Sequence, residues 1–297
     1  MQSTLQRHLP LLALILAMIL WASSFIALKI ALQNYDPMIV IFGRLFIASL
    51  CFLLIGRRLY MTLDYRRGDF KAILFMAFCE PCLYFLFEGN AVVFTTASQA
   101  GIITAILPIL VMVAASLFLK EKIKRKSWAG AAAALLGVCW LTLQSSPVDN
   151  APNPMLGNFF EVMAMVCATG YIITLKSLTS RYSPFFLTAV QAFFGTLFYF
   201  PLLFLPTTAY PVHYTLGPSL AIVYLGGGIT LGAYGLYNYS VKHFPASRTA
   251  AFINLIPIFS VLLGWLVLGE TLSPGQGLAV FVIVGGVYLS QTAYQQG

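Results

Sequence analysis

Residues 97–121 read ASQAGIITAILPILVMVAASLFLKE, and residues 246–270 read ASRTAAFINLIPIFSVLLGWLVLGE. The two stretches align without a gap, so that Pro108 matches Pro257 and Glu121 matches Glu270. Each stretch contains an apolar run of about 20 residues, the length that an α-helix needs to cross a bilayer. The chain therefore repeats a unit with the dimensions of a membrane span.

The charges beside the repeated stretch are not copied with it. The first copy carries five cations around its glutamate and the second carries none, the matched positions being Lys120, Lys122, Lys124, Arg125 and Lys126 in the first and Gly269, Thr271, Ser273, Pro274 and Gly275 in the second. Cytoplasmic loops of membrane proteins carry an excess of Lys and Arg. We therefore expect the two copies to be inserted upside down relative to each other, as in carriers built from inverted repeats.

The composition supports a membrane protein. Hydrophobic residues make up 60% of the 297 residues and charged residues 9%, whereas a soluble domain has about 25% charged residues. The mean hydropathy is +0.86. The net charge of +8 lies in short loops between apolar runs, which is typical of orientation signals rather than of a nucleic-acid-binding face. We expect the lipid bilayer as a partner and no nucleic acid.

The apolar runs predict an all-α integral membrane fold with ten transmembrane helices. Five lie in a first repeat, residues 1–146, and five in a second, inverted repeat, residues 147–297; the spans are about 11–32, 38–56, 70–88, 91–118, 127–144, 155–176, 185–206, 217–240, 248–268 and 275–293. An odd number of spans per copy by itself inverts the second copy. The front of the unit recurs as well, since Lys29, Tyr35 and Pro37 match Lys176, Tyr182 and Pro184.

The loop charges predict that both termini lie inside. With that orientation the outer connections 33–37, 89–90, 145–154, 207–216 and 269–274 contain no Lys or Arg. Basic pairs such as Arg57 with Arg58, and Lys242 with Arg248, fall in or beside inner segments. Of the 17 Lys and Arg residues, Lys29 and Arg44 are the exceptions, and their positions within spans need a separate explanation.

Catalytic and metal chemistry lack their usual residues. The five cysteines all lie in apolar runs, and the Cys79–Cys82 pair has no second pair to complete a zinc site. The three histidines lie in loops or at span ends, and no aspartate lies deep in a span. We expect no catalytic residue, no metal and no cofactor, and an integral-membrane enzyme is the alternative with least support.

Several local patterns coincide along the chain. They are Trp21-Ala-Ser-Ser-Phe25 with Lys29, Pro37 with Arg44, Ala97-Ser98 leading to Pro108, Leu119-Lys-Glu121, Gly130 with Gly137, and the Ala-Ser, Pro and Leu-Gly-Glu series of the second half. Together they resemble the drug/metabolite transporter superfamily, in its ten-helix EamA-type branch. Within that branch the chain is similar to bacterial inner-membrane exporters of aromatic and other amino acids. The second half departs from the pattern, with Ala168-Thr-Gly-Tyr171 where the first has Trp21-Ala-Ser-Ser24.

In inverted-repeat carriers the substrate site lies near the midplane, often where helices are broken. Pro108 and Pro257 supply matched breaks in the fourth and ninth spans. Each proline removes a backbone donor and frees a carbonyl about one turn earlier, near Thr104 and Ile253. These prolines are the candidate gating positions, and a simple packing kink is the alternative.

The third span carries Glu80, Tyr84 and Glu88 at intervals of four residues, which places them on one helix face. Because a charge at the bilayer centre is costly, Glu80 is not expected to face lipid. It could be protonated, pair with a cation, contact a substrate amino group, or bond to another helix as a neutral carboxyl. Glu88 is expected near the outer surface in contact with water, and Glu161, early in the sixth span, near the surface too.

Two cations lie within spans. Arg44 could receive a substrate carboxylate or form an internal ion pair with a glutamate. Lys29, near the end of the first span, is expected to extend toward the interface, and Lys176 to do the same on the other side.

Further in-span residues are candidates for lining an amphipathic cavity. Aromatic and polar side chains here could surround a hydrophobic amino-acid side chain, with helix packing or helix bridging as the alternative; they are Trp21, Ser24, Phe25, Tyr84, Gln99, Tyr171, Tyr234, Tyr237, Asn238 and Asn254. Gln191 is a polar in-span residue of the same kind.

The resulting hypothesis is an alternating-access exporter of amino acids and related small metabolites in the bacterial inner membrane. Proton coupling, an ion-independent facilitator and a channel all stay open. The oligomeric state is open too, and a monomer is one of the options. A carrier of phosphorylated or nucleotide sugars is the alternative cargo class, but it would require several deep cations, and the spans offer Arg44 alone in that role.

Overall fold

The computed structural model describes residues 4–55, 66–119, 125–244, 249 and 252–295. Within these ranges the regular elements are helices, and β-type pairing is limited to an isolated bridge between Val148 and Ala151. Eight helical segments are long and apolar enough to cross a membrane, and two shorter apolar helices follow, Leu255–Leu268 and Pro274–Ser290. The all-helical membrane fold is thus confirmed, while membrane crossing by all ten segments stays a prediction.

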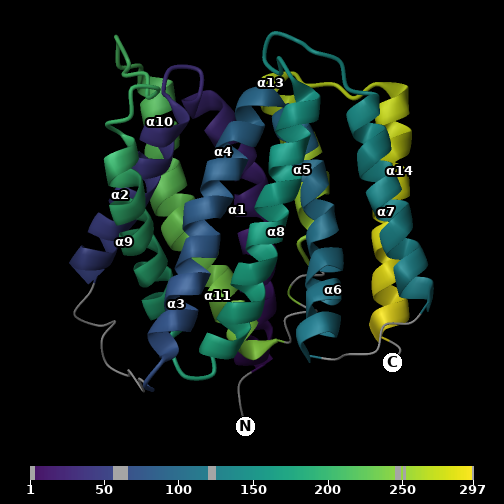
Figure 1. Ribbon diagram of the computed structural model, residues 1–297, viewed down its shortest axis with the longest axis horizontal. Helices are drawn as coiled ribbons and strands as arrows, with labels where there is room; N and C mark the ends of the chain where they lie inside the picture. Colours follow the sequence, from purple (N-terminus) through teal and green to yellow (C-terminus); the bar gives the residue numbers. More distant parts are fainter. Residues whose placement is uncertain (1–3, 56–65, 120–124, 245–248, 250–251, 296–297) are drawn as a thin grey trace.

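The helices stand side by side as a bundle (Figure 1). The first half of the chain forms α1 (Thr4–Ala31), α2 (Pro37–Ile55), α3 (Asp69–Ala77), η2 (Phe78–Leu83), α4 (Tyr84–Phe94), α5 (Ala97–Ile103), η3 (Thr104–Ile106), α6 (Leu107–Leu119) and α7 (Arg125–Leu143). The second half forms α8 (Pro154–Leu178), α9 (Pro184–Leu202), α10 (Leu216–Tyr224), η4 (Leu225–Ala233), α11 (Tyr234–His243), α13 (Leu255–Leu268) and α14 (Pro274–Gln295).

The connection between the third and fourth predicted spans lies later than the sequence suggests. No loop forms at 89–90, because α4 continues to Phe94 and α5 begins at Ala97. Asn90 stays helical with its side-chain amide bonded to the Leu86 carbonyl at 2.7 Å. The break comes at Thr96, whose side chain caps α5 by accepting the Gln99 N–H. Glu88 is therefore inside a helix rather than at its end.

The third span of each half is interrupted by a π-helical segment, η2 in the first and η4 in the second. In η2 the backbone of Glu80 is extended, with φ −146° and ψ 117°. Side chains of α9 bind the carbonyls of this segment, since Gln191 Nε2 donates to the Glu80 carbonyl at 2.9 Å and the Tyr199 hydroxyl to the Cys82 carbonyl at 2.5 Å. Such partners are required where no water can bond the backbone.

The helix is also interrupted just before each of the two matched prolines. The 3₁₀ segment η3 precedes Pro108, and turn residues 253–254 precede α13 with Pro257. The expectation of freed carbonyls was wrong, because the Thr104 carbonyl accepts the Leu107 N–H and the Ile253 carbonyl accepts the Ile256 N–H. Tightening to i→i+3 hydrogen bonds satisfies these groups locally.

The two repeated lysines hold helix ends in both halves. Lys29 is buried, and its Nζ donates to the carbonyls of Val92 and Thr95, at 2.6 and 2.8 Å, at the end of α4. Lys176 makes the same pair of bonds at the end of α11, at 2.9 Å to the Val241 carbonyl and 2.8 Å to that of Phe244. The prediction that these side chains extend to the interface was wrong, because unpaired carbonyls at a helix C-terminus attract a cation.

A further contact joins the copied Ala-Ser and Glu motifs across the two halves. The Glu270 carboxylate accepts the N–H groups of Ala97 and Ser98, at 3.0 and 2.8 Å, and the Ser98 hydroxyl at 2.6 Å. This arrangement caps the N-terminus of α5. The matching residues of the other copy, Ala246, Ser247 and Glu121, lie outside the described residues. So do several of the cations used to predict the orientation: Arg57, Arg58, Lys120, Lys122, Lys124 and Arg248.

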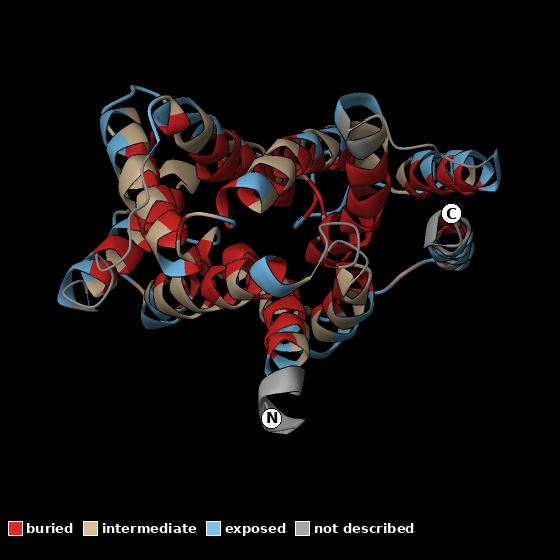
Figure 2. Ribbon diagram, turned by 90° about the horizontal axis from the view of Figure 1, so that it is seen from below, coloured by how far each residue is buried: buried red, intermediate tan, exposed pale blue. Residues whose placement is uncertain are grey.

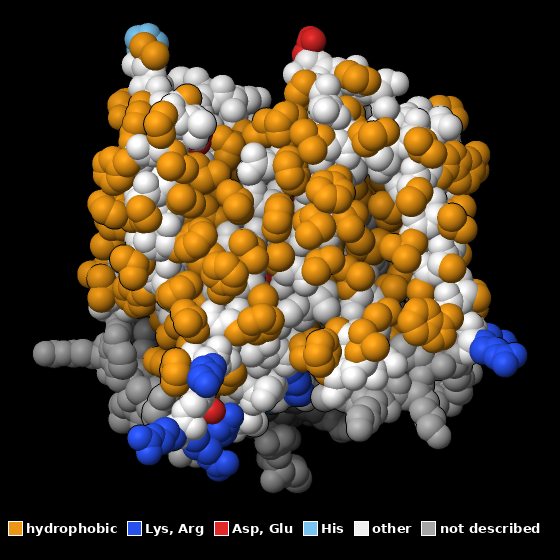
Figure 3. Space-filling view, viewed as in Figure 1, with side chains coloured by type: hydrophobic (Ala, Val, Ile, Leu, Met, Phe, Trp, Pro, Cys, Tyr) orange, Lys and Arg blue, Asp and Glu red, His pale blue; other side chains and the backbone are white. Residues whose placement is uncertain are grey.

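Both termini lie at one end of the bundle (Figure 1). The Lys and Arg side chains on the face seen in Figure 3 gather at that same end, and the opposite end shows none. This distribution agrees with the expected N-in, C-in orientation. Buried residues face the middle of the bundle, and the pair formed by α7 and α14 stands at its side (Figure 2).

The α7–α14 pair is packed through small residues. A Cβ at Gly130 would lie 2.4 Å from the Ser290 nitrogen and 2.5 Å from the Gly286 carbonyl oxygen. The two backbones can therefore approach this closely because these positions are glycines.

Candidate functional site

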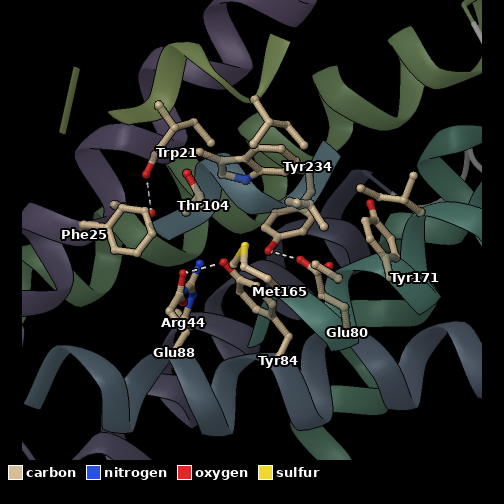
Figure 4. Close-up of a pocket in the computed structure, with 16 residues that line it drawn as sticks. Trp21, Phe25, Arg44, Glu80, Tyr84, Glu88, Thr104, Met165, Tyr171 and Tyr234 are labelled. Carbon is tan, nitrogen blue, oxygen red and sulfur yellow. Dashed lines mark hydrogen bonds and ion pairs between the residues drawn. The ribbon is translucent and has the colours of Figure 1, made fainter. Parts of the chain in front are cut away.

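A small cavity lies among the helices of the bundle, and its lining of apolar and aromatic side chains with a few polar groups is typical of small-molecule sites (Figure 4). Both halves of the chain contribute to its wall, which consists of Trp21, Ser24, Phe25, Arg44, Glu80, Tyr84, Glu88, Thr104, Leu107, Met165, Ala168, Tyr171, Ile172, Tyr234, Ile253 and Ile256. The residues at the two proline breaks, Thr104 and Ile253, are part of this wall. The interrupted helices therefore meet at the cavity.

Arg44 of α2 is the cation of the cavity wall. It is buried, and its guanidinium lies 3.5 Å from the Glu88 carboxylate and 3.2 Å from the Thr230 hydroxyl, to which it donates. The guanidinium carbon also lies 4.0 Å from the centre of the Phe85 ring. The ion-pair alternative for Arg44 is thus the one seen. The prediction that Glu88 contacts water near the outer surface was wrong, because α4 extends beyond it and buries it.

Glu80 lies on the opposite side of Tyr84 from Glu88, in the broken part of the third span (Figure 4). It is buried, and its carboxyl accepts a hydrogen bond from the Tyr234 hydroxyl of α11. Tyr84 lies between the two acids and donates to Glu88 at 2.9 Å. Glu88 therefore has a cation beside it, whereas Glu80 is bonded to a neutral hydroxyl. The extended backbone at Glu80 turns its side chain toward the second half.

Aromatic rings form much of the remaining wall. The Trp21 ring contacts Tyr234 edge-on with centroids 5.1 Å apart, and Tyr171 contacts Tyr234 at 6.4 Å. Phe25 and Tyr84 face the same space from α1 and α4 (Figure 4). The chemistry of this wall suits a large apolar group, with which its rings make offset or edge-on contacts.

Four residues predicted as possible cavity lining lie outside the wall. Gln99 bridges helices near the start of α5, where its carbonyl oxygen accepts from Asn158 at 3.1 Å and Ser145 at 2.8 Å. Tyr237 packs behind Trp21, with ring centroids 4.7 Å apart. Asn238 accepts from the Tyr171 hydroxyl and donates to Thr188, and Asn254 immediately precedes α13. Tyr237 and Asn238 thus support lining residues rather than line the cavity.

Sequence reasoning missed the apolar part of the wall. Met165, Ala168 and Ile172 of α8 recur at intervals of three and four residues, a pattern that cannot be told from ordinary packing. Leu107 and Ile256 were missed too, although both adjoin a matched proline. Their signal was available, because a helix break near the midplane predicts that its neighbours line a cavity.

Glu161 of α8 was expected near the surface, and that prediction was wrong. Its side chain is fully buried, and its carboxyl oxygens have no hydrogen-bond partner among the described residues. It lies one turn before Met165 of the cavity wall. α8 packs along α4, and this contact covers Glu161 although it is close to the beginning of its helix.

These features, a helical bundle, paired helix breaks and a buried amphipathic cavity, are matched by a family of known proteins. The profile of the EamA-like transporter family matches residues 8–143 and again residues 155–292. The chain belongs to the EamA-like transporter family. This membership makes it a membrane transporter rather than an enzyme. The family profile matches the chain twice, once in each half.

Individual relatives agree with this assignment. An uncharacterized transporter of Archaeoglobus fulgidus is 25% identical, covering 94% of this chain and 97% of its own. The uncharacterized transporter YcxC of Bacillus subtilis is 28% identical over 84% of this chain and 82% of its own. A probable terminal-alkyne amino-acid exporter of Streptantibioticus cattleyicolor is 23% identical over 92% of this chain and 88% of its own.

The fold of this EamA-like transporter is also seen in a solved crystal structure. The two align with a TM-score of 0.64 at 19% identity, covering 96% of this chain and 97% of the other. At that identity the likeness concerns the fold alone.

Proposed function

We propose that this EamA-like transporter exports amino acids, preferentially those with large apolar or aromatic side chains, through the central cavity. The observation that carries the proposal is the composition of the cavity wall. It combines one cation, Arg44, with two carboxyls, Glu80 and Glu88, and an aromatic surface. A zwitterion needs both signs of charge, and an apolar side chain needs the aromatic surface.

The geometry of the Arg44–Glu88 pair supports a contact in which a substrate carboxylate replaces Glu88 at the guanidinium. Its separation of 3.5 Å exceeds the 2.7–2.9 Å of strong charge-assisted hydrogen bonds. A substrate carboxylate that binds the guanidinium in a bidentate fashion makes shorter bonds than Glu88 does. The substrate ammonium then binds Glu80, so that each substrate charge removed from water meets an opposite charge.

The aromatic surface receives the substrate side chain. Trp21, Phe25, Tyr171 and Tyr234 surround the space beyond the charged groups. Burial of one aromatic side chain contributes on the order of 2–3 kcal/mol, and ring contacts add to it. Amino acids with small or charged side chains should therefore bind more weakly. The relative in Streptantibioticus cattleyicolor is named as a probable terminal-alkyne amino-acid exporter, and this name supports amino acids as the class of cargo.

The proposed transport cycle uses the repeat. Two inverted five-helix units, residues 1–146 and 147–297, alternate about the cavity in a bacterial inner membrane, with both termini in the cytoplasm. The breaks before Pro108 and Pro257 supply the flexible points at the cavity wall. A sugar-phosphate cargo is less well supported, because a phosphate requires several cations and the described wall offers one beside two carboxyls.

Counterflow in proteoliposomes tests the proposal. Vesicles are loaded with unlabelled L-phenylalanine, L-leucine, L-threonine, L-glutamate or glucose 6-phosphate, and entry of the same labelled compound is followed. We expect saturable counterflow that is fastest for phenylalanine and absent for glucose 6-phosphate. Counterflow of the sugar phosphate without phenylalanine would overturn the cargo class. Flux that does not saturate and shows no counterflow would replace the carrier by a channel.

A further inference from the structure

A second cavity lies away from the transport pathway, on the side of the bundle between α3 and α9. It is a groove of about 410 Å³ whose lining is apolar, formed by Phe70, Ile73, Leu74, Ala77, Tyr182, Phe186, Val190 and Phe194. The one polar atom of these side chains, the Tyr182 hydroxyl, is turned to Asp69 and donates to it at 2.8 Å. Phe70 and Leu74 are half exposed, so the groove is open to the surroundings of the bundle.

The groove follows the helices. Phe70, Ile73, Leu74 and Ala77 share one face of α3, and residues spaced by four on α9, from Phe186 to Phe194, form the facing wall. That stretch of α9 rises by about 12 Å, roughly the depth of one leaflet's hydrocarbon. Because the surroundings of a membrane-spanning bundle at this level are lipid, the shape suits an acyl chain.

Cations stand at the mouth of the groove, at the end of the bundle that holds the termini. Arg66, Arg67 and Lys71 are exposed at the start of α3, and Arg181 immediately precedes Tyr182 of the lining. Among the described residues at this mouth Asp69 is the one carboxylate, and it accepts from the Arg181 guanidinium at 3.0 Å. Figure 3 shows this gathering of basic side chains over the start of α3. The mouth therefore carries an excess of positive charge at headgroup level.

We propose that this groove binds one acidic phospholipid of the inner leaflet, with an acyl chain between α3 and α9 and the phosphate group among Arg66, Arg67 and Lys71. The charge excess distinguishes an acidic from a zwitterionic lipid, since each Lys or Arg near the surface contributes about fivefold in binding to an anionic headgroup. The excess of cations in inner loops would explain Arg66, Arg67 and Lys71 without any ligand. It would not explain why an apolar groove begins beside them.

The position of the lipid has a structural consequence. α3 continues directly into the interrupted segment Phe78–Leu83 that carries Glu80. Val190 of the groove adjoins Gln191, which binds the Glu80 carbonyl. An acyl chain between α3 and α9 therefore supports the two helices that hold one wall of the transport cavity.

Native mass spectrometry of the detergent-purified transporter tests the site. Dioleoyl-phosphatidylglycerol and dioleoyl-phosphatidylcholine are titrated separately, and glycerol 3-phosphate is added as a headgroup without tails. Three proteins are compared: the wild type, Arg67→Gln/Lys71→Gln, and Val190→Phe, which fills the groove. The double variant Arg125→Gln/Lys126→Gln is the matched control, because it removes two exposed cations at the start of α7, at the same end of the bundle but away from the groove.

We expect one phosphatidylglycerol to bind the wild type at least tenfold more tightly than phosphatidylcholine. Arg67→Gln/Lys71→Gln should weaken phosphatidylglycerol binding by about 25-fold, whereas the control should change that binding less than threefold. Val190→Phe should weaken the binding of both lipids. Equal binding of the two lipids by the wild type would overturn the proposal without recourse to any variant. An equal loss of phosphatidylglycerol binding in the control variant would also overturn it. The same holds if glycerol 3-phosphate alone displaces the lipid, or if the protein dimerises instead of binding lipid.

Discussion

The two halves of the chain form similar helices but contribute different chemistry to the central cavity. The first half supplies the charges, Arg44, Glu80 and Glu88, whereas the second supplies uncharged side chains, namely Met165, Ala168, Tyr171, Ile172, Tyr234, Ile253 and Ile256. At the repeat positions of Arg44 and Glu88 the second half has Gln191 and Tyr237. The scaffold is thus symmetric and the cavity is not.

This difference separates two kinds of residue. Features present in both halves, such as the Lys29 and Lys176 contacts and the breaks before Pro108 and Pro257, belong to the framework that both orientations share. Under the proposed function, features present in one half determine what the cavity accepts. Substitutions in the first group should change stability and rate, and those in the second should change cargo binding.

The largest effect is expected at Arg44. Arg44→Gln should reduce phenylalanine counterflow by at least about 100-fold, because the substrate carboxylate loses its cation and Glu88 is left buried without one. The same variant should unfold at a lower temperature, since breaking a buried ion pair is strongly destabilising. Counterflow and thermal unfolding are measured on the same preparations.

A double variant distinguishes folding from cargo binding at this position. Arg44→Gln/Glu88→Gln removes both charges and should restore most of the thermal stability without restoring transport. If the double variant transports as well as the wild type, then Arg44 serves the framework, and the assignment of the charged wall to the cargo is wrong.

Glu80 should show the next largest effect. Glu80→Gln keeps the size of the side chain and removes the negative charge, so we expect the half-saturating phenylalanine concentration to rise about tenfold. The maximal rate should change less. Tyr234→Phe, which removes the hydroxyl that bonds Glu80, is the milder companion. An unchanged half-saturation in Glu80→Gln would place the substrate ammonium elsewhere.

The symmetric lysines provide a test on the framework side of the comparison. Lys29→Met removes two bonds to buried carbonyls and should lower the free energy of unfolding by about 2–4 kcal/mol. Lys176→Met should cost about half as much, because Lys176 is only partly buried and water can replace it. Cargo preference should stay unchanged in both. A change in preference with intact stability would contradict the division between framework and cavity.

The smallest effect is expected at Glu161. Its carboxyl is buried without a hydrogen-bond partner in the part of the chain that the structure describes, so Glu161→Met exchanges a desolvated polar group for an apolar one of similar size. Such replacements are neutral or stabilising. Thermal unfolding of the variant should match or exceed the wild type. A clear loss of stability would mean that Glu161 has a role in the framework that its surroundings do not explain.

The architecture could be predicted from the sequence because it depends on the length of apolar runs and on loop charges. The copied prolines likewise indicated where helices are interrupted. The boundary near Gly89 could not be placed, since glycine and asparagine in an apolar run do not end a helix when a neighbouring carbonyl takes the side-chain amide. The true signal was the Thr96 cap of α5.

The candidate cavity could be predicted in part. Eight of the predicted residues line it, among them Arg44 and Glu80, because ionisable groups in a span face the interior rather than lipid. The partners were not accessible from the sequence. Pairing of Arg44 with Glu88 and of Lys29 with the end of α4 depends on how helices pack, and the apolar lining from α8 has no polar signature.

The central claim is that the charged wall binds the two ends of a zwitterion. The direct measurement is competition against labelled L-phenylalanine counterflow by unlabelled L-phenylalanine, by phenethylamine, which lacks the carboxylate, and by 3-phenylpropionate, which lacks the amine. The account predicts that the wild type prefers phenylalanine over both analogues by at least about tenfold, since an unpaired buried charge disfavours each analogue. Inhibition by either analogue at the same concentration as phenylalanine would contradict it.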